Sequence, residues 1–283
     1  MLSVLSEDAD DSVRERAGNA LLNQSTEAFV AALNGDNPPA QLFRYCGSNL
    51  IAKPGIAEAL AKNSRCPMQF LTPAVKALPT SAVQELMLDL ERLSSNRGLV
   101  AALVQSPSLT ADQRQQLEEL LADKPAPESA LAQAVAQIDA PAEQRVTLLQ
   151  RLAGLRVVER VQLALKGNRE ERMALIRDPC KVVQRAVLQS ARITDREVET
   201  FSSMASLTDE VLRLIATSRN FRRNYSVVIN LMNNPKTPLD ITLRMLTSIT
   251  APDLKKLAAN RNISDTLRSA ANRLQVQRTQ KRE

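Results

Sequence analysis

Apolar residues in the second half of the chain recur at helical spacing. In DEVLRLIA (209–216) they fall on one side of a helix with 3.6 residues per turn. Residues typical of helix N-termini precede several such runs, including Thr194, Thr208 and Thr237. Pro238 follows Thr237, and proline is tolerated in a first turn because its missing N–H has no helical partner there. The pattern predicts a series of short helices.

The second half also repeats itself. Three stretches align without gaps: ALIRDPCKVVQRAVL (174–188), ATSRNFRRNYSVVIN (216–230) and AANRNISDTLRSAAN (258–272). Arg177, Arg219 and Arg261 consequently fall 42 residues apart. Each unit contains about three short helices, which must stack on neighbouring units to bury their apolar faces. We predict an all-α fold, an α-solenoid of stacked short helices with a repeat of about 42 residues that is clearest in the C-terminal half.

The motifs LIRDP, LIATSRN and LAANRNIS carry a resemblance to known repeat proteins. They resemble the HEAT/armadillo class of α-solenoids and the leucine-rich repeat variant proteins, whose units combine an α-helix with a shorter turn of helix. The resemblance covers about residues 155–275. It implies an architecture and is nearly silent on function, because such folds have many unrelated partners.

The first half shows the same pattern less regularly, with apolar helices separated by turns. We expect four segments: acidic degenerate repeats over 1–122, a Pro/Ala-rich boundary over 123–144, basic repeats over 145–276, and a frayed basic tail over 277–283. The boundary segment has three prolines around the predicted helix ESALAQAVAQI. It is either a hinge or a long loop between repeats that contains one helix.

Composition agrees with helices rather than strands. The 283 residues are 44% hydrophobic but only 2% aromatic, so the core must consist of Leu, Ala, Val and Ile. No basic segment followed by a long apolar run starts the chain, and no stretch approaches a membrane span, so we expect no membrane insertion. Cys46, Cys66 and Cys180 lack metal-ligand spacing. They predict buried free thiols and a cytoplasmic location.

Charge is divided unevenly along the chain. Residues 1–150 hold 12 Lys and Arg against 18 Asp and Glu, a net charge of −6. Residues 151–283 hold 25 against 13, a net charge of +12, and 19 of those 25 are arginines. Such asymmetry between halves favours an anionic partner for the basic half.

Catalytic motifs are missing from the sequence. There is no histidine, no phosphate-binding glycine-rich motif and no Gly-x-Ser-x-Gly turn. Adjacent carboxylates such as Glu170 and Glu171 diverge around a helix and favour a solvated face. We therefore expect no enzymatic activity, no catalytic residues, no metal site and no cofactor.

Arginines near the repeat marks are the candidate contact residues. Stacked repeats would place Arg177, Arg219 and Arg261 as a ladder along one edge, although Arg followed by Asp or Asn also suits a helix end structurally. Arg222 and Arg223 differ, because the other two repeats have different residues at those positions. Lys181 is expected nearby.

Three functional interpretations remain open for these six residues. The first is a scaffold that binds an extended or acidic protein partner through Arg177, Lys181, Arg219, Arg222, Arg223 and Arg261. The second is sequence-independent binding of a nucleic-acid backbone by the basic half. The third is a solvated or intramolecular charge face. The sequence leaves the oligomeric state open.

Overall fold

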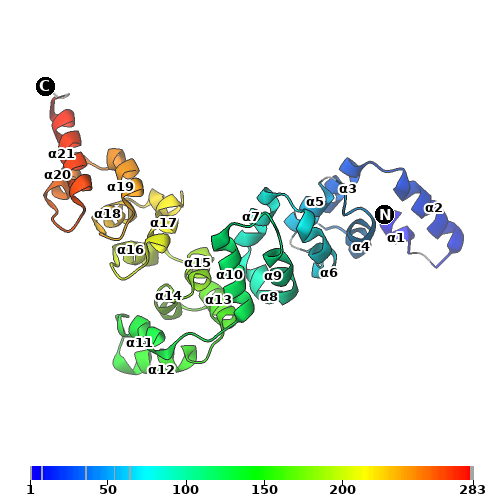
Figure 1. Ribbon diagram of the computed structural model, residues 1–283, viewed down its shortest axis with the longest axis horizontal. Coiled ribbons are helices and arrows are strands. Elements are labelled where there is room, and N and C mark those ends of the chain that lie inside the picture. Colours follow the sequence, from blue (N-terminus) through cyan, green and yellow to red (C-terminus); the bar gives the residue numbers. More distant parts are fainter. Residues whose placement is uncertain (1, 8, 36, 54, 64, 281–283) are drawn as a thin grey trace. The chain divides into compact units, whose positions relative to one another are not determined.

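The computed structural model describes residues 2–7, 9–35, 37–53, 55–63 and 65–280. The chain divides into two compact units, Met1–Asp123 and Lys124–Glu283, each of which is described by itself (Figure 1). Helices supply the regular structure of these residues, where no β-strand occurs and an isolated β-bridge joins Pro125 and Arg156. The prediction of an all-α chain is confirmed.

The first unit consists of short helices and one 3-10 segment: α1 (Leu2–Leu5), α2 (Asp11–Leu22), α3 (Thr26–Leu33), α4 (Ala40–Asn49), α5 (Ile56–Lys62), α6 (Met68–Leu71), η1 (Thr72–Ala77), α7 (Thr80–Leu88), α8 (Leu90–Ser95), α9 (Arg97–Val104) and α10 (Ala111–Ala122). Helix α5 packs against α3 and α7. Asn63, which follows α5, donates from Nδ2 to the carbonyl of Leu33 at 2.6 Å and so joins the ends of α5 and α3.

The second unit continues with α11 (Glu128–Ala136), α12 (Ala142–Leu152), α13 (Val157–Lys166), α14 (Arg169–Leu175), α15 (Lys181–Gln189), α16 (Asp195–Ser203), α17 (Asp209–Thr217), η2 (Phe221–Arg223), α18 (Tyr225–Asn233), α19 (Leu239–Met245), η3 (Leu246–Ser248), α20 (Ala251–Ala259) and α21 (Asp265–Gln280). Helix α11 packs on α12 and α14. Helix α21 reaches Gln280, so it includes part of the segment 277–283 that we expected to fray; residues 281–283 lie outside the described ranges.

Side-chain caps explain where several of these helices begin. The Thr194 hydroxyl accepts from the Glu197 N–H, and the Glu197 carboxylate accepts from the Thr194 N–H, which completes a capping box. Thr208 caps α17 by accepting from the Val211 N–H. Helix α19 starts later than the sequence predicts, because Pro238 has an extended ψ of 136° and so precedes the first helical residue.

From α13 onward, each helix packs against the helix that lies two places later in the chain. Contacts join α13 to α15, α15 to α17, and α19 to α21 in one layer, and α16 to α18 and α18 to α20 in the other. An ion pair supplies the one remaining link between neighbouring helices in each layer. Arg172 of α14 pairs with Glu197 of α16, and Arg213 of α17 pairs with Asp240 of α19. Odd-numbered helices from α13 therefore form one layer and even-numbered helices from α14 form the other.

Two fully buried ion pairs hold the start of this arrangement together. In the first, Arg160 Nε lies 2.8 Å from Asp178 Oδ2, and both side chains are at most 2% exposed. Arg160 also donates to the Leu155 carbonyl, while Asp178 accepts from the Cys180 N–H. These bonds tie α13 to the turn between α14 and α15.

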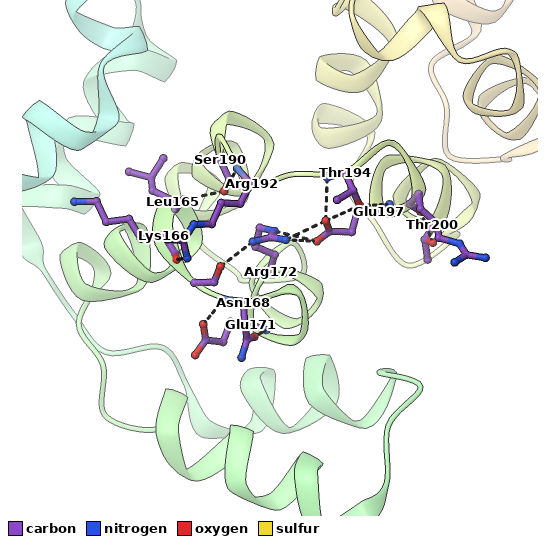
Figure 2. Close-up of polar contacts among 12 residues, drawn as sticks. Leu165, Lys166, Asn168, Glu171, Arg172, Ser190, Arg192, Thr194, Glu197 and Thr200 are labelled. Carbon is purple, nitrogen blue, oxygen red and sulfur yellow. Dashed lines mark hydrogen bonds and ion pairs between the residues drawn. The ribbon is translucent and has the colours of Figure 1, made fainter.

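The second buried pair has a similar construction. Arg172 donates from Nε and Nη2 to the two Glu197 oxygens at 2.9 and 3.0 Å, and from Nη1 to the Gly167 carbonyl (Figure 2). Burial would raise the pKa of the Glu197 carboxyl, but hydrogen bonds from Arg172 and Thr194 outweigh burial and hold that pKa below its usual value.

Removal of one partner of the first pair should be far more damaging than removal of both. Arg160→Met leaves Asp178 buried without its cation, and we expect it to lower the free energy of unfolding by about 3–5 kcal/mol. The double variant Arg160→Met/Asp178→Leu should lose clearly less. Urea unfolding followed by circular dichroism measures both. Arg213→Met, which breaks an exposed pair, is the control and should cost under about 1 kcal/mol.

Glu197 should make stability depend on acid pH. Because its folded pKa lies below its unfolded value, ionised Glu197 stabilises the fold fully above the unfolded pKa, and this contribution is lost as pH falls through the folded pKa. The difference in free energy of unfolding between wild type and Glu197→Gln should therefore shrink as pH falls from 7 toward 3. A difference that stays constant over this range would contradict the assignment. Glu170→Gln, at an exposed position, is the control.

Candidate functional site

The two-layer packing places the turns of the second unit on two opposite edges. Successive helices alternate between layers, so successive turns alternate between edges. We name the Arg223 edge after the turns at 167–168, 190–194, 218–224 and 246–250, and the Arg177 edge after the turns at 176–180, 204–208, 234–238 and 260–264.

Hydrogen bonds between successive turns support the Arg223 edge. Arg192 donates to the Lys166 carbonyl at 2.8 Å. The Thr250 N–H donates to the Tyr225 hydroxyl at 3.0 Å, which joins the starts of α20 and α18. Arg278, near the end of α21, donates to the Ile249 carbonyl at 2.8 Å. Together with the bond from Asn224 to Glu199, which joins α18 to α16, these contacts connect the edge from α13 to α21.

The Arg177 edge has its own contacts. Arg177 Nη2 lies 3.0 Å from the Met204 sulfur, and Asn234 Nδ2 donates to the Met204 carbonyl at 3.0 Å. Asn260 Nδ2 donates to Asn233 Oδ1 at 2.8 Å. These bonds connect the turns after α14, α16, α18 and α20 in order.

The six predicted contact residues divide between the edges. Arg177, Lys181 and Arg261 lie on or beside the Arg177 edge, whereas Arg219, Arg222 and Arg223 lie on the Arg223 edge. The expected ladder of Arg177, Arg219 and Arg261 along one edge does not form. The reason is geometrical: three helices, α15, α16 and α17, lie between Arg177 and Arg219, and an odd number of intervening helices places two turns on opposite edges.

On the Arg177 edge, two of the predicted cations already have partners. Arg177 is half-buried and donates to the Met173 carbonyl, and burial lowers its pKa. Lys181 Nζ lies 2.9 Å from Glu210 Oε2. Arg261 is exposed, and its side chain has no ion pair or hydrogen bond within the described ranges.

The turn at 218–224 presents its arginines differently. Arg219, Arg222 and Arg223 are exposed, and their side chains form no ion pair or hydrogen bond with the residues that the structure describes. The following residue, Asn224, caps α18 and donates to Glu199 Oε1 at 2.6 Å, so the turn is anchored to α16. Three solvated guanidinium groups therefore project from an anchored turn.

The charged residues within the turns of the Arg223 edge have one sign. Its four turns contain Arg192, Arg219, Arg222 and Arg223 and no acidic residue. The turns of the Arg177 edge contain Arg177, Lys236, Arg261 and the buried Asp178. The Arg223 edge thus has the larger number of exposed cations.

A groove of about 730 Å³ extends along α13 and includes Gly167, Asn168 and Arg192 from the turns of the Arg223 edge. Lys166, Asn168 and Arg192 contribute polar groups, and Leu155, Val158 and Leu163 contribute apolar surface. Figure 2 includes Lys166, Asn168, Arg192 and the neighbouring Glu171. Buried Glu171 pairs with Arg151 at 2.6 Å and accepts from the Asn168 N–H. The expectation of a solvated position is therefore wrong for Glu171, whereas Glu170 is exposed.

Sequence reasoning missed Lys166, Arg192 and this groove. A signal was present in the N-cap residues. Successive members of the series Asn168, Thr194, Asn224 and Thr250 are closer together in sequence than Arg177 and Arg219 are. The shorter interval corresponds to two helices, the distance between neighbours in one layer. The longer interval between the arginines makes this shorter interval harder to recognise in the sequence.

Among the residues that the structure describes, no group of three or more Cys, Asp and Glu side chains is placed to hold a metal ion. None of the described helices is both long and apolar enough to cross a membrane. Cys46, Cys66 and Cys180 are buried and form no disulfide among the described residues.

No protein-family model, curated protein or solved structure matches the chain. The resemblance to HEAT/armadillo and leucine-rich repeat variant proteins is compatible with the all-helical fold, and it stays an expectation beyond that.

The thiols should be unreactive in the folded chain. Burial, with a smaller contribution from Cys66, raises the pKa of the Cys46 thiol to about 12, and burial raises the pKa of Cys66 to about 11. Because the thiolate is the reactive species, an aromatic disulfide reagent at pH 7.5 should modify all three cysteines only after denaturation. Ser206→Cys, at an exposed turn position, is the positive control. Rapid reaction of native wild type would contradict the burial.

Proposed function

We propose that this protein is a non-catalytic α-solenoid scaffold that binds an extended or acidic protein partner through an arginine-rich surface. The observation that carries the proposal is the turn at 218–224, where Arg219, Arg222 and Arg223 are exposed without ion pairs among the described residues. Exposed charges of one sign raise the local potential and attract an oppositely charged partner.

The helix positions support the repeat that the sequence predicts. Helix α20 starts 42 residues after α17 starts and ends 42 residues after α17 ends. The same interval separates Arg177 from Arg219. The starts of α15 and α21 are separated by twice that interval. We propose that the second unit is HEAT/armadillo-like or leucine-rich-repeat-variant-like, with stacked helices that present a long surface to a partner.

A protein partner agrees better with the aromatic residues than a nucleic acid does. Single-stranded nucleic acids are usually bound by exposed rings on which bases stack. Here Phe221 is half-buried. Tyr225 is 40% exposed, but its hydroxyl donates to Asp253 Oδ2 at 2.8 Å, so this turn offers one exposed ring rather than a series of them. Sequence-independent binding of a nucleic-acid backbone is the second candidate, favoured by the net positive charge of the basic half.

We propose the cytoplasm as the location of this scaffold. The three cysteines are buried and form no disulfide among the described residues, as expected for a chain that folds in a reducing compartment.

The test compares two anionic probes. Fluorescent poly-glutamate and a duplex DNA of arbitrary sequence are titrated with the full chain over a range of salt concentrations. Poly-glutamate should bind, and Arg222→Glu/Arg223→Glu should weaken its binding about tenfold or more, because two attractive contacts become repulsive. Arg16→Glu/Arg97→Glu makes the same charge change at exposed positions of the first unit and is the control.

Binding of the DNA alone, with a steep linear dependence of log affinity on log salt, would favour the nucleic-acid candidate. If wild type binds neither probe, or if the control variant weakens binding as much as the arginine variant, the scaffold proposal is wrong.

A further inference from the structure

We infer that the Arg223 edge is the partner surface of the second unit, and that it binds an extended acidic protein segment whose apolar side chain enters the groove beside Leu163. The inference rests on the scaffold function proposed above and gives it a location and a ligand chemistry. The inference excludes the Arg177 edge as the partner surface, although three of the six contact residues predicted from the sequence lie on or beside that edge.

The first step is the charge of the two edges. The turns of the Arg223 edge contain four arginines and no carboxylate. On the Arg177 edge, Lys181 is paired with Glu210, and Arg177 is directed at the Met173 carbonyl and the Met204 sulfur. An anionic segment therefore meets more available positive charge on the Arg223 edge.

The second step is continuity. The hydrogen bonds that join Lys166 to Arg192, Tyr225 to Thr250, and Ile249 to Arg278 place successive turns side by side. Packed helices lie about 8–10 Å apart, so an edge of five successive positions extends for about 40 Å. A fully extended chain of about 12 residues covers this length. The edge suits an extended segment rather than a single ion.

The third step is the groove, which distinguishes a peptide from a phosphate chain. Leu155, Val158 and Leu163 provide apolar surface that a phosphodiester backbone does not use. The glutamates that line the groove already face arginines, since Glu171 pairs with Arg151 and Glu159 pairs with Arg156. An apolar side chain flanked by carboxylates matches the apolar surface and the cations of the groove, because the side chain contacts the leucines while its neighbours approach Lys166 and Arg192.

The anchoring of the turn adds preorganisation. Asn224 donates to Glu199 Oε1 at 2.6 Å, and Asn230 donates to the Glu199 carbonyl at 3.0 Å. The Arg222 N–H donates to the Ser218 carbonyl at 3.2 Å within the turn. Since the backbone that presents the arginines is already held, binding orders their side chains alone and loses less entropy.

The experiment uses the full chain and two labelled peptides made of glutamate and serine, each of about 15 residues so that an extended peptide spans the edge. One has a single central leucine, and in the other a serine replaces that leucine. Fluorescence anisotropy measures both affinities. The leucine peptide should bind more tightly than the serine peptide, by about threefold or more, because one apolar side chain leaves water.

Two variants of equal charge change compare the edges. Arg222→Glu/Arg223→Glu should weaken binding of both peptides about tenfold or more, and Lys236→Glu/Arg261→Glu, at exposed positions of the Arg177 edge, should change it about twofold or less. Leu163→Gln should remove the preference for leucine and leave affinity for the serine peptide unchanged. Circular dichroism confirms that each variant is folded.

The outcomes separate the inference from the proposed function. Equal losses from both edge variants, or equal binding of the two peptides by wild type, would overturn the inference while acidic-segment binding still stands. Failure of wild type to bind either peptide would overturn both. Displacement of a bound peptide by duplex DNA at equal charge concentration, with tighter binding of the DNA, would assign the edge to a nucleic-acid backbone instead.

Discussion

Short helices that cannot bury their apolar faces alone are the constraint on which this structure depends. Helices as short as α14 and α13 expose too much apolar surface to persist singly. From α13 onward each therefore packs on the second helix after it, which produces two layers with turns on two edges. This alternation determines which turns of the second unit lie on the same edge.

Polar side chains at the turns keep this packing in register. The buried pairs Arg160–Asp178 and Arg172–Glu197 each connect a guanidinium group to a carboxylate that also caps or closes a neighbouring turn. Farther along, an amide replaces the ion pairs, since Asn234 donates to the carbonyls of Ser202 and Met204. Because these buried groups are paired between neighbouring helices, a slip of one helix would leave several of them unpaired.

The same turns give the proposed function its surface. A turn that Asn224 anchors to α16 can present Arg219, Arg222 and Arg223 to solvent without unfolding the helix that follows. The groove near Leu163 lies on the same edge, so charge and apolar surface occur together on one side of the unit. This combination is what favours an acidic protein segment over a simple polyanion.

The sequence by itself determined the all-α fold, since apolar spacing, caps such as Thr194 and Thr208, and poverty in aromatic residues are local properties. It also singled out Arg222 and Arg223, because they depart from the repeat. Only the tertiary structure decided which arginines share an edge. Arg177 and Arg219 occupy equivalent positions in the repeat, yet three intervening helices place them on opposite edges. The groove likewise joins Arg151, Leu163 and Arg192, which are distant in sequence, and such neighbours follow from packing between helices rather than from any local pattern.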